Sequence, residues 1–169
     1  TSQSLGSIVI RKSEDGGYTW SHPEDSNSGL LFEAGPRLEL PNYHYSAMPL
    51  LTHGGRLYGA FEDVRRPAAL IPGSDGVLGM TGLQSFVLSI ADEDDLLNAF
   101  NWTMSNKLDL VPEHAPKGWQ KPADLNWREG NVVVAPNGEI WNILCVKSKP
   151  HVPGQVGIAA VVKVSQDGR

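Results

Sequence analysis

Side chains that could bind and process a sugar are concentrated in a few polar segments of this 169-residue chain. Aromatic rings stack on pyranose faces, carboxylates act as acids and bases, and arginine pairs through two parallel hydrogen bonds with the carboxylate of an anionic sugar. These residue types predict a carbohydrate site for an acidic sugar or glycan. The residues predicted to bind substrate are Arg37, Tyr43, His44, Tyr45, Glu62, Asp63, Arg65, Arg66, Trp127 and Arg128.

Composition limits the alternative partners. The formal net charge of −5 argues against nucleic acid or an anionic membrane as the main partner. No apolar run approaches the roughly 20 residues that are needed to span a bilayer. The histidines show no metal-ligand spacing, so neither a metal nor another cofactor is predicted. The single cysteine, Cys145, excludes an internal disulfide and leaves the compartment open.

The elements that must position these side chains are predicted to be short strands. The chain has 18 glycines and 12 prolines and lacks long helical periodicities, which favours strands joined by turns. An internal repeat supports this prediction. Residues Met48 to Phe61 align without a gap over Asn131 to Leu144, and each copy reads as a strand, a glycine-containing turn and a second strand.

A second periodicity places a serine near the end of three β-like runs. Ser13, Ser89 and Ser165 are spaced 76 and again 76 residues apart, and the last begins the segment Ser165-Gln166-Asp167-Gly168. The middle copy departs from the pattern, because an acidic run is followed by apolar residues at 96–100. This departure predicts a short helical turn, with the next strand beginning at 101–103.

The first of these serines opens a turn that reads Ser13-Glu14-Asp15-Gly16-Gly17-Tyr18-Thr19-Trp20. The Asp15 side chain is predicted to accept hydrogen bonds from the turn, and the glycines supply positive φ. Thr19 and Trp20 are predicted to begin the returning strand, with the indole between packed sheets. The pattern resembles the Asp-box of sialidase-type β-propellers, whose defining positions are here Ser13, Asp15, Gly17, Thr19 and Trp20.

Together, the repeats and the resemblance predict an all-β fold, a partial sialidase-like β-propeller of the six-bladed type with about two and a half four-stranded blades. The predicted single domain consists of a blade remnant at 1–36, a blade at 37–112 and an incomplete blade at 113–169. Missing blades or another copy would complete the ring. In such a propeller the Asp-box turn lies on the face opposite the loops that carry the predicted binding residues.

The same resemblance implies a catalytic residue. Sialidases carry a Glu before the first strand of a blade, then a glycine turn, then an Arg that binds the substrate carboxylate; the Glu activates a nucleophilic Tyr. The run Glu129-Gly130-Asn131-Val132-Val133 with Asn137-Gly138 matches the first two elements. Glu129 is therefore the predicted catalytic residue. The arginine position falls on Cys145, which cannot replace a guanidinium group.

Three functions remain open on these grounds. The first is a retaining exo-glycosidase of sialidase type. The second is a non-catalytic propeller that binds glycan or protein, which the missing arginine favours. The third is a polysaccharide lyase: propeller lyases use His and Tyr to remove a proton next to a uronate carboxylate, and Tyr43, His44 and Tyr45 with Arg65 and Arg66 would supply the required groups. The resemblance also suggests a secreted or periplasmic location.

Overall fold

The described part of the protein is all-β. The computed structural model describes residues 6–36, 39–45, 48–64, 69–70, 78–79, 83–108, 126–147 and 158–168. Apart from a single 3₁₀ turn, η1, the described residues form no helix. The elements are β1 (Ile8–Val9), β2 (Leu30–Phe32), β3 (Tyr43–His44), β4 (Leu51–His53), β5 (Arg56–Val64), β6 (Ala69–Leu70), β7 (Leu78–Gly79), β8 (Leu83–Ala91), η1 (Ala99–Asn101), β9 (Thr103–Met104), β10 (Asn126–Val134), β11 (Ile140–Lys147) and β12 (Ile158–Val164).

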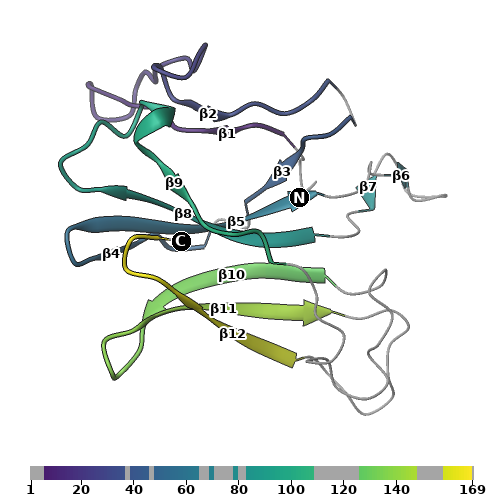
Figure 1. Cartoon of the computed structure of the whole chain (residues 1–169). Coiled ribbons are helices and arrows are strands. Elements are labelled where there is room, and N and C mark those ends of the chain that lie inside the picture. The colour runs from purple at the N-terminus through teal and green to yellow at the C-terminus, as the bar shows by residue number, and fades with distance from the viewer. Residues whose placement is uncertain are drawn as a thin grey trace.

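Antiparallel pairing arranges these strands into separate sheets, none of which closes into a barrel. The central sheet has five strands; β3 and β4 pair with one edge of β5, and β8 and β9 follow on its other side. A two-stranded β1–β2 sheet covers one face of it, and the β10–β11–β12 sheet covers the other (Figure 1). This layered arrangement agrees with the predicted incomplete propeller. Each sheet also lies within one predicted blade segment, although the blade boundaries stay a prediction.

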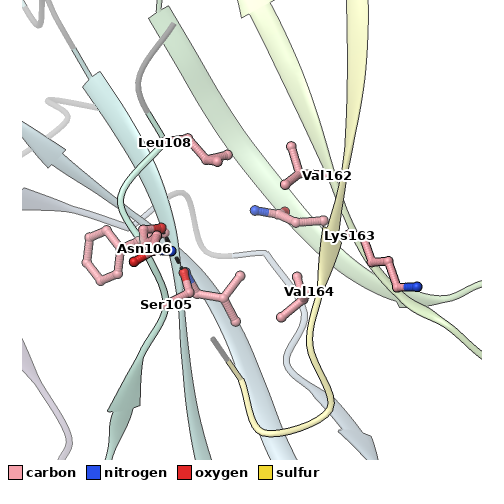
Figure 2. A pocket seen from close by; sticks show the side chains of 9 residues that line it. Ser105, Asn106, Leu108, Val162, Lys163 and Val164 are labelled. Carbon is pink, nitrogen blue, oxygen red and sulfur yellow. Dashed lines mark hydrogen bonds between the residues drawn. The ribbon is translucent and has the colours of Figure 1, made fainter. Parts of the chain in front are cut away.

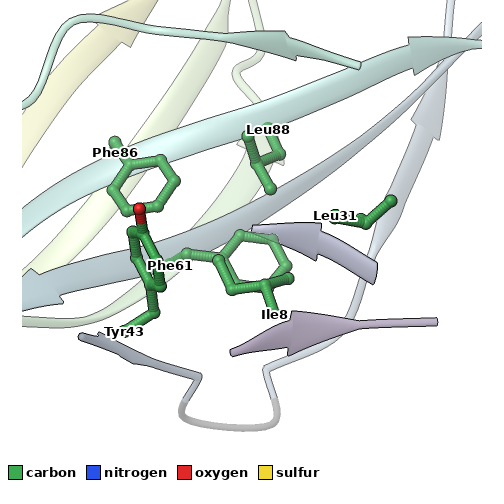
Figure 3. Close-up of a cluster of buried hydrophobic side chains, with 6 residues drawn as sticks. All are labelled: Ile8, Leu31, Tyr43, Phe61, Phe86 and Leu88. Carbon is green, nitrogen blue, oxygen red and sulfur yellow. The ribbon is translucent and has the colours of Figure 1, made fainter. Parts of the chain in front are cut away.

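The central sheet is buried on both of its faces. Strand β5 alternates, so that Phe61 joins an apolar cluster with the β1–β2 sheet, which Figure 3 shows with Tyr43, Phe86 and Leu88. On β5, Tyr58 and Ala60 face the opposite way. They form a second cluster with Val87 of β8 and with Val132, Ile140 and Val164 of β10, β11 and β12. Residues 83–90 of β8 are all buried, because both sides of that strand are covered.

The internal repeat corresponds to two hairpins, β4–β5 and β10–β11, as predicted. Their turns differ by one residue. In the first hairpin His53 pairs with Arg56 around Gly54-Gly55, whereas in the second the Ala135 N–H donates to Glu139 O around three residues. The predicted helical turn in the middle copy is confirmed as η1, and the following strand, β9, begins at Thr103.

The turn at Ser13–Trp20 is closed by its own side chains. The Asp15 carboxylate accepts from the Thr19 N–H (2.9 Å), the Thr19 hydroxyl (2.6 Å) and the Ser13 hydroxyl (2.9 Å). Ser13 Oγ in turn accepts from the Gly17 N–H at 2.7 Å, and Gly16 and Gly17 both have positive φ. The hydrogen bonds from Thr19 and then Ser13 lower the pKa of Asp15 to about 2. The predicted role of Asp15 is confirmed.

Two expectations for this turn are wrong. The returning strand does not begin at Thr19; it begins at Leu30, because the chain makes a further turn at residues 25–29 before β2 pairs with β1. Trp20 does not lie between sheets, since it is 57% exposed and its indole N–H donates to Gly17 O at 3.0 Å within the turn. The indole therefore completes the turn rather than the core.

The segment at Ser165 repeats part of this arrangement. The Ser165 hydroxyl donates to the Asp167 carboxylate, as Ser13 does to Asp15. This turn also contacts the central sheet: the Tyr58 hydroxyl donates to Gln166 O at 2.8 Å, and Gly168 lies so close to Ser89 that a Cβ would collide with its hydroxyl. The third serine thus lies at the junction between two sheets.

Candidate functional site

A buried histidine and a buried glutamate form the centre of the candidate site. His44 on β3 and Glu62 on β5 are directly opposite one another in the antiparallel register. His44 Nδ1 lies 2.8 Å from Glu62 Oε2, and the two side chains are only 5% and 1% exposed. Ionisable groups are this deeply buried only when they are paired and hydrogen-bonded. Both side chains lie on the face of the central sheet that packs against β10–β12, because they alternate with Tyr43 and Asp63.

Glu129 reaches this pair through its main chain. Its N–H donates to Glu62 Oε1 at 2.6 Å, so the two oxygens of one carboxylate connect β3 with β10. Glu129 lies in a β-bulge, where the register with β11 shifts between Arg128 and Asn131. Its φ is +55°, and it is the only non-glycine residue in the described part of the chain with positive φ. Bulges of this kind redirect a side chain out of the regular alternation of the strand.

The Glu129 carboxylate is accessible, in contrast to that of Glu62. Its side chain is 38% exposed, and its Oε1 lies 3.8 Å from a terminal nitrogen of the Arg128 guanidinium, whose side chain is 15% exposed. A ligand can therefore reach the Glu129 carboxylate, and Arg128 places a positive charge at the adjacent position of the same strand. These two groups could exchange a proton with a ligand and bind an anionic part of it.

Gly130 allows β10 to approach the central sheet at this point. A Cβ on Gly130 would lie 2.6 Å from Asn142 Oδ1 and 2.9 Å from both Ala60 Cβ and a Leu144 methyl group. No side chain fits there, so glycine permits the main chain of Glu129 to reach Glu62. Asn142 is itself 2% exposed, and its amide nitrogen donates to Ser85 Oγ across the two sheets at 3.3 Å.

Tyr43 and Asp63 lie on the other face of the central sheet. Tyr43 is 8% exposed and packs in the apolar cluster, and burial raises the pKa of its hydroxyl while the nearby Lys107 opposes that effect. Asp63 forms an ion pair with Lys107, whose Nζ lies 2.5 Å from Asp63 Oδ2 and also lies over the rings of Tyr43 and Phe86. Sequence reasoning missed Lys107, because nothing in its own segment marks it as a partner of Asp63.

Several residues were expected in loops but lie in strands. Tyr43 and His44 form β3, and Glu62 and Asp63 belong to β5, because the two segments pair with each other in antiparallel register. Tyr45, just after β3, is 41% exposed; its ring stacks on Phe61 with centroids 4.8 Å apart, and its hydroxyl donates to Met48 O. The burial of Tyr43 and His44 favours supporting roles for both, whereas Tyr45 stays a candidate for ligand contact.

The remaining predicted binding residues cannot be placed relative to the site. Arg37, Arg65 and Arg66 lie outside the described residues, and so does the side chain of Trp127, although its main chain belongs to β10. Cys145 is described: it is partly exposed and lies directly opposite Arg128 in the β10–β11 register. The structure thus brings together His44, Glu62, Arg128 and Glu129 from the predicted set.

Asn142 and Ser85 were not predicted for this region, although the sequence carries a signal for them. Each is a polar residue in phase with buried apolar neighbours, Asn142 with Ile140 and Leu144, and Ser85 with Val87. A polar side chain at such a position must find a partner inside the fold, and these two find each other.

A separate small hollow of about 140 Å³ lies between the segment after β9 and strand β12. Figure 2 shows Ser105, Asn106, Leu108, Val162, Lys163 and Val164 around it. Its walls are largely apolar and contain none of the predicted binding residues.

Two further observations concern the described residues alone. They contain no cluster of three or more His, Cys, Asp or Glu side chains that could hold a metal ion. None of their helical segments has the length and apolar character required to cross a lipid bilayer.

Comparisons with known proteins show little similarity to this chain. No family model matches it, and no curated protein matches it. Among solved structures, it is similar to an alpha-L-arabinofuranosidase from Lactobacillus brevis, with 15% sequence identity and a TM-score of 0.38 over 70% of this chain. The match covers 33% of the arabinofuranosidase chain, so this protein spans about a third of that enzyme's length. A TM-score this low does not establish a shared fold.

Proposed function

We propose that the protein provides part of a glycosidase-type site of sialidase-like character, with Glu129 as the catalytic carboxylate and acidic sugars or glycans as substrates. The observation that carries the proposal is the backbone of Glu129. A residue with a Cβ is held at φ +55°, in a bulge, by a hydrogen bond to a buried carboxylate. Non-glycine residues in such conformations are concentrated at functional sites, where the surrounding structure maintains them.

The chemistry available to Glu129 fits this role. A partly exposed carboxylate can accept a proton from a nucleophile or a water molecule during cleavage of a glycosidic bond. Arg128, next to it in sequence and 3.8 Å away, supplies a positive charge that would attract the carboxylate of an acidic sugar. Glu62 cannot act as the second catalytic group, because its side chain is 1% exposed.

Hydrolysis of fluorogenic glycosides by the full-length protein tests the proposal, with a sialoside and a glucuronide as acidic substrates and an arabinofuranoside as a neutral one. We expect hydrolysis of an acidic substrate and a loss of about 100-fold or more in kcat for Glu129→Gln, since general acid–base catalysis contributes about 10²–10⁴-fold. Glu139→Gln is the matched control. Glu139 is a partly exposed carboxylate at the far end of the same hairpin, where it pairs with Lys163. Equal activity of wild type and Glu129→Gln would contradict the proposal.

A non-catalytic glycan-binding propeller is the second candidate, and the observation that favours it is Cys145 at the expected arginine position. Under that alternative the protein binds the acidic glycan, measured by calorimetry, and hydrolyses none of the substrates. The lyase alternative predicts release of an ultraviolet-absorbing unsaturated uronide that is abolished in His44→Ala. The burial of His44 against Glu62 disfavours it, because a catalytic base must reach its substrate.

A further inference from the structure

The structure assigns Glu62 as a positioning residue for Glu129, with His44 holding Glu62 in place. The predicted effect of Glu62 on kcat rests on the proposed function of Glu129, whereas its predicted effect on the backbone conformation of Glu129 does not. Glu62 does not act on the substrate, since its carboxylate is buried. It acts through the main chain of Glu129, and so determines where the exposed Glu129 carboxylate points.

The geometry of the three residues supports this assignment. The Glu62 carboxylate uses one oxygen for His44 Nδ1 at 2.8 Å and the other for the Glu129 N–H at 2.6 Å. Burial strengthens both hydrogen bonds, because the local dielectric constant is low. The residues come from β3, β5 and β10, so the contact joins the central sheet to the next sheet at the position of the bulge.

The strained conformation of Glu129 explains why such a contact is needed. Left-handed φ is unfavourable for a residue with a Cβ, and a β-bulge leaves one residue outside the regular ladder of hydrogen bonds. The Glu62 carboxylate supplies a partner for that main-chain N–H. Without it, the bulge could relax toward regular strand geometry, and the Glu129 side chain would alternate to a different direction.

Sequence patterns around Glu62 agree with a role beyond packing. The residues before and after it on the same face of β5, Ala60 and Val64, are buried and apolar. An apolar residue at position 62 would fill this layer at a lower cost in desolvation, since burying a polar side chain costs free energy that only its hydrogen bonds offset. A carboxylate there is explained by the specific partner that it selects, the N–H of Glu129.

The test compares Glu62→Gln, Glu62→Leu and Tyr58→Phe with wild type in the full-length protein. Tyr58→Phe is the matched control. Like Glu62, Tyr58 is a β5 residue whose side chain hydrogen-bonds to the main chain of another segment, here to Gln166 O, and Gln166 is far from Glu129 in sequence. We expect kcat on the acidic glycoside to fall about 100-fold in Glu62→Leu, the size of effect that follows small misplacement of a catalytic group. KM should stay within about threefold, because the ligand contacts are retained. Glu62→Gln, which keeps an oxygen acceptor, should recover part of kcat.

Nuclear magnetic resonance supplies readouts that do not depend on activity. In wild type, we expect a scalar coupling across the hydrogen bond between the Glu129 amide nitrogen and the Glu62 carboxyl carbon. In Glu62→Leu, the φ-dependent amide–Hα coupling of Glu129 should change to the value of an extended strand, whereas Tyr58→Phe should leave it unchanged. The inference is overturned if Glu129 keeps its left-handed φ without Glu62, or if the cross-bond coupling is absent in wild type.

These readouts separate the two proposals. A wild-type protein that hydrolyses no glycoside contradicts the proposed function, while the φ of Glu129 in Glu62→Leu still decides the positioning role. Conversely, activity that is lost in Glu129→Gln but retained in Glu62→Leu supports the proposed function and refutes the positioning role. An equal fall in kcat for Glu62→Leu and Tyr58→Phe also refutes it, because a general loosening of the sheets would then explain both.

Discussion

Replacing Glu129 by glycine should stabilise the protein relative to replacing it by alanine. Both substitutions remove the carboxylate, and both keep the N–H that donates to Glu62. They differ in the cost of φ +55°. A residue with a Cβ pays about 1–2 kcal/mol for left-handed geometry. Glycine avoids that cost but loses about 0.5–1 kcal/mol through the greater freedom of its unfolded chain.

The net expectation is an advantage of roughly 0.5–1 kcal/mol for Glu129→Gly over Glu129→Ala. For a chain of 169 residues, such a difference corresponds to about 1–4 °C in Tm. Urea unfolding followed by tryptophan fluorescence gives the free energies of unfolding, and calorimetry gives Tm. Both variants should lack the proposed activity, because neither has the carboxylate.

Asn131 provides the matched comparison, since it lies at the other end of the same bulge and its φ is not positive. There the order should reverse, and Asn131→Ala should be more stable than Asn131→Gly by about 0.5–1 kcal/mol. The reasoning is refuted if alanine is at least as stable as glycine at position 129 while position 131 shows the normal order. That result would mean that Glu129 is not held in a left-handed conformation in solution.

Three further predictions concern contacts around the site and in the first turn. Gly130→Ala should lower the free energy of unfolding by about 1–3 kcal/mol in urea titrations, because its Cβ would collide with Asn142 Oδ1, and no loss would contradict the close approach of the sheets. His44→Ala should cost about 1–3 kcal/mol, since it removes one buried hydrogen-bond partner of the Glu62 side chain; replacing both residues by apolar ones should cost less, and equal costs would argue against the pairing. Asp15 has a folded pKa of about 2, below its unfolded value, so its contribution to stability is present above about pH 4 and is lost as pH falls through about 2; a carboxyl ¹³C titration with a midpoint near 4 would contradict this.

Much of the fold could be predicted from the sequence because it depends on local patterns. The repeated hairpins at Gly54-Gly55 and Asn137-Gly138 follow from turn residues between apolar runs, and they were correctly predicted. The Asp15 turn follows from side-chain groups that bond within a few residues of each other. Trp20 was misplaced because a large aromatic residue is usually buried, whereas here the turn uses its N–H locally.

The candidate site could be predicted less completely, because its contacts join distant segments. Glu62 lies opposite His44 because of the register between β5 and β3, and no pattern around either residue in the sequence indicates the other as its partner. At the bulge, Gly130 packs against Ala60 of the central sheet, and this contact depends on how the two sheets meet. The sequence therefore identified Glu129 as a candidate, but the partner of its main chain emerged only from the assembled sheets.

The burial of β8 on both faces has a consequence for the order in which the protein opens. Residues 83–90 are covered by the β1–β2 sheet on one side and by β10–β12 on the other, so their amides cannot reach solvent through a local fluctuation of either layer alone. In native-state hydrogen exchange they should form the slowest-exchanging group and report global unfolding. The outer sheets should detach in smaller steps, and the Glu129 amide, bonded across one of these junctions, should exchange at the rate at which that junction opens.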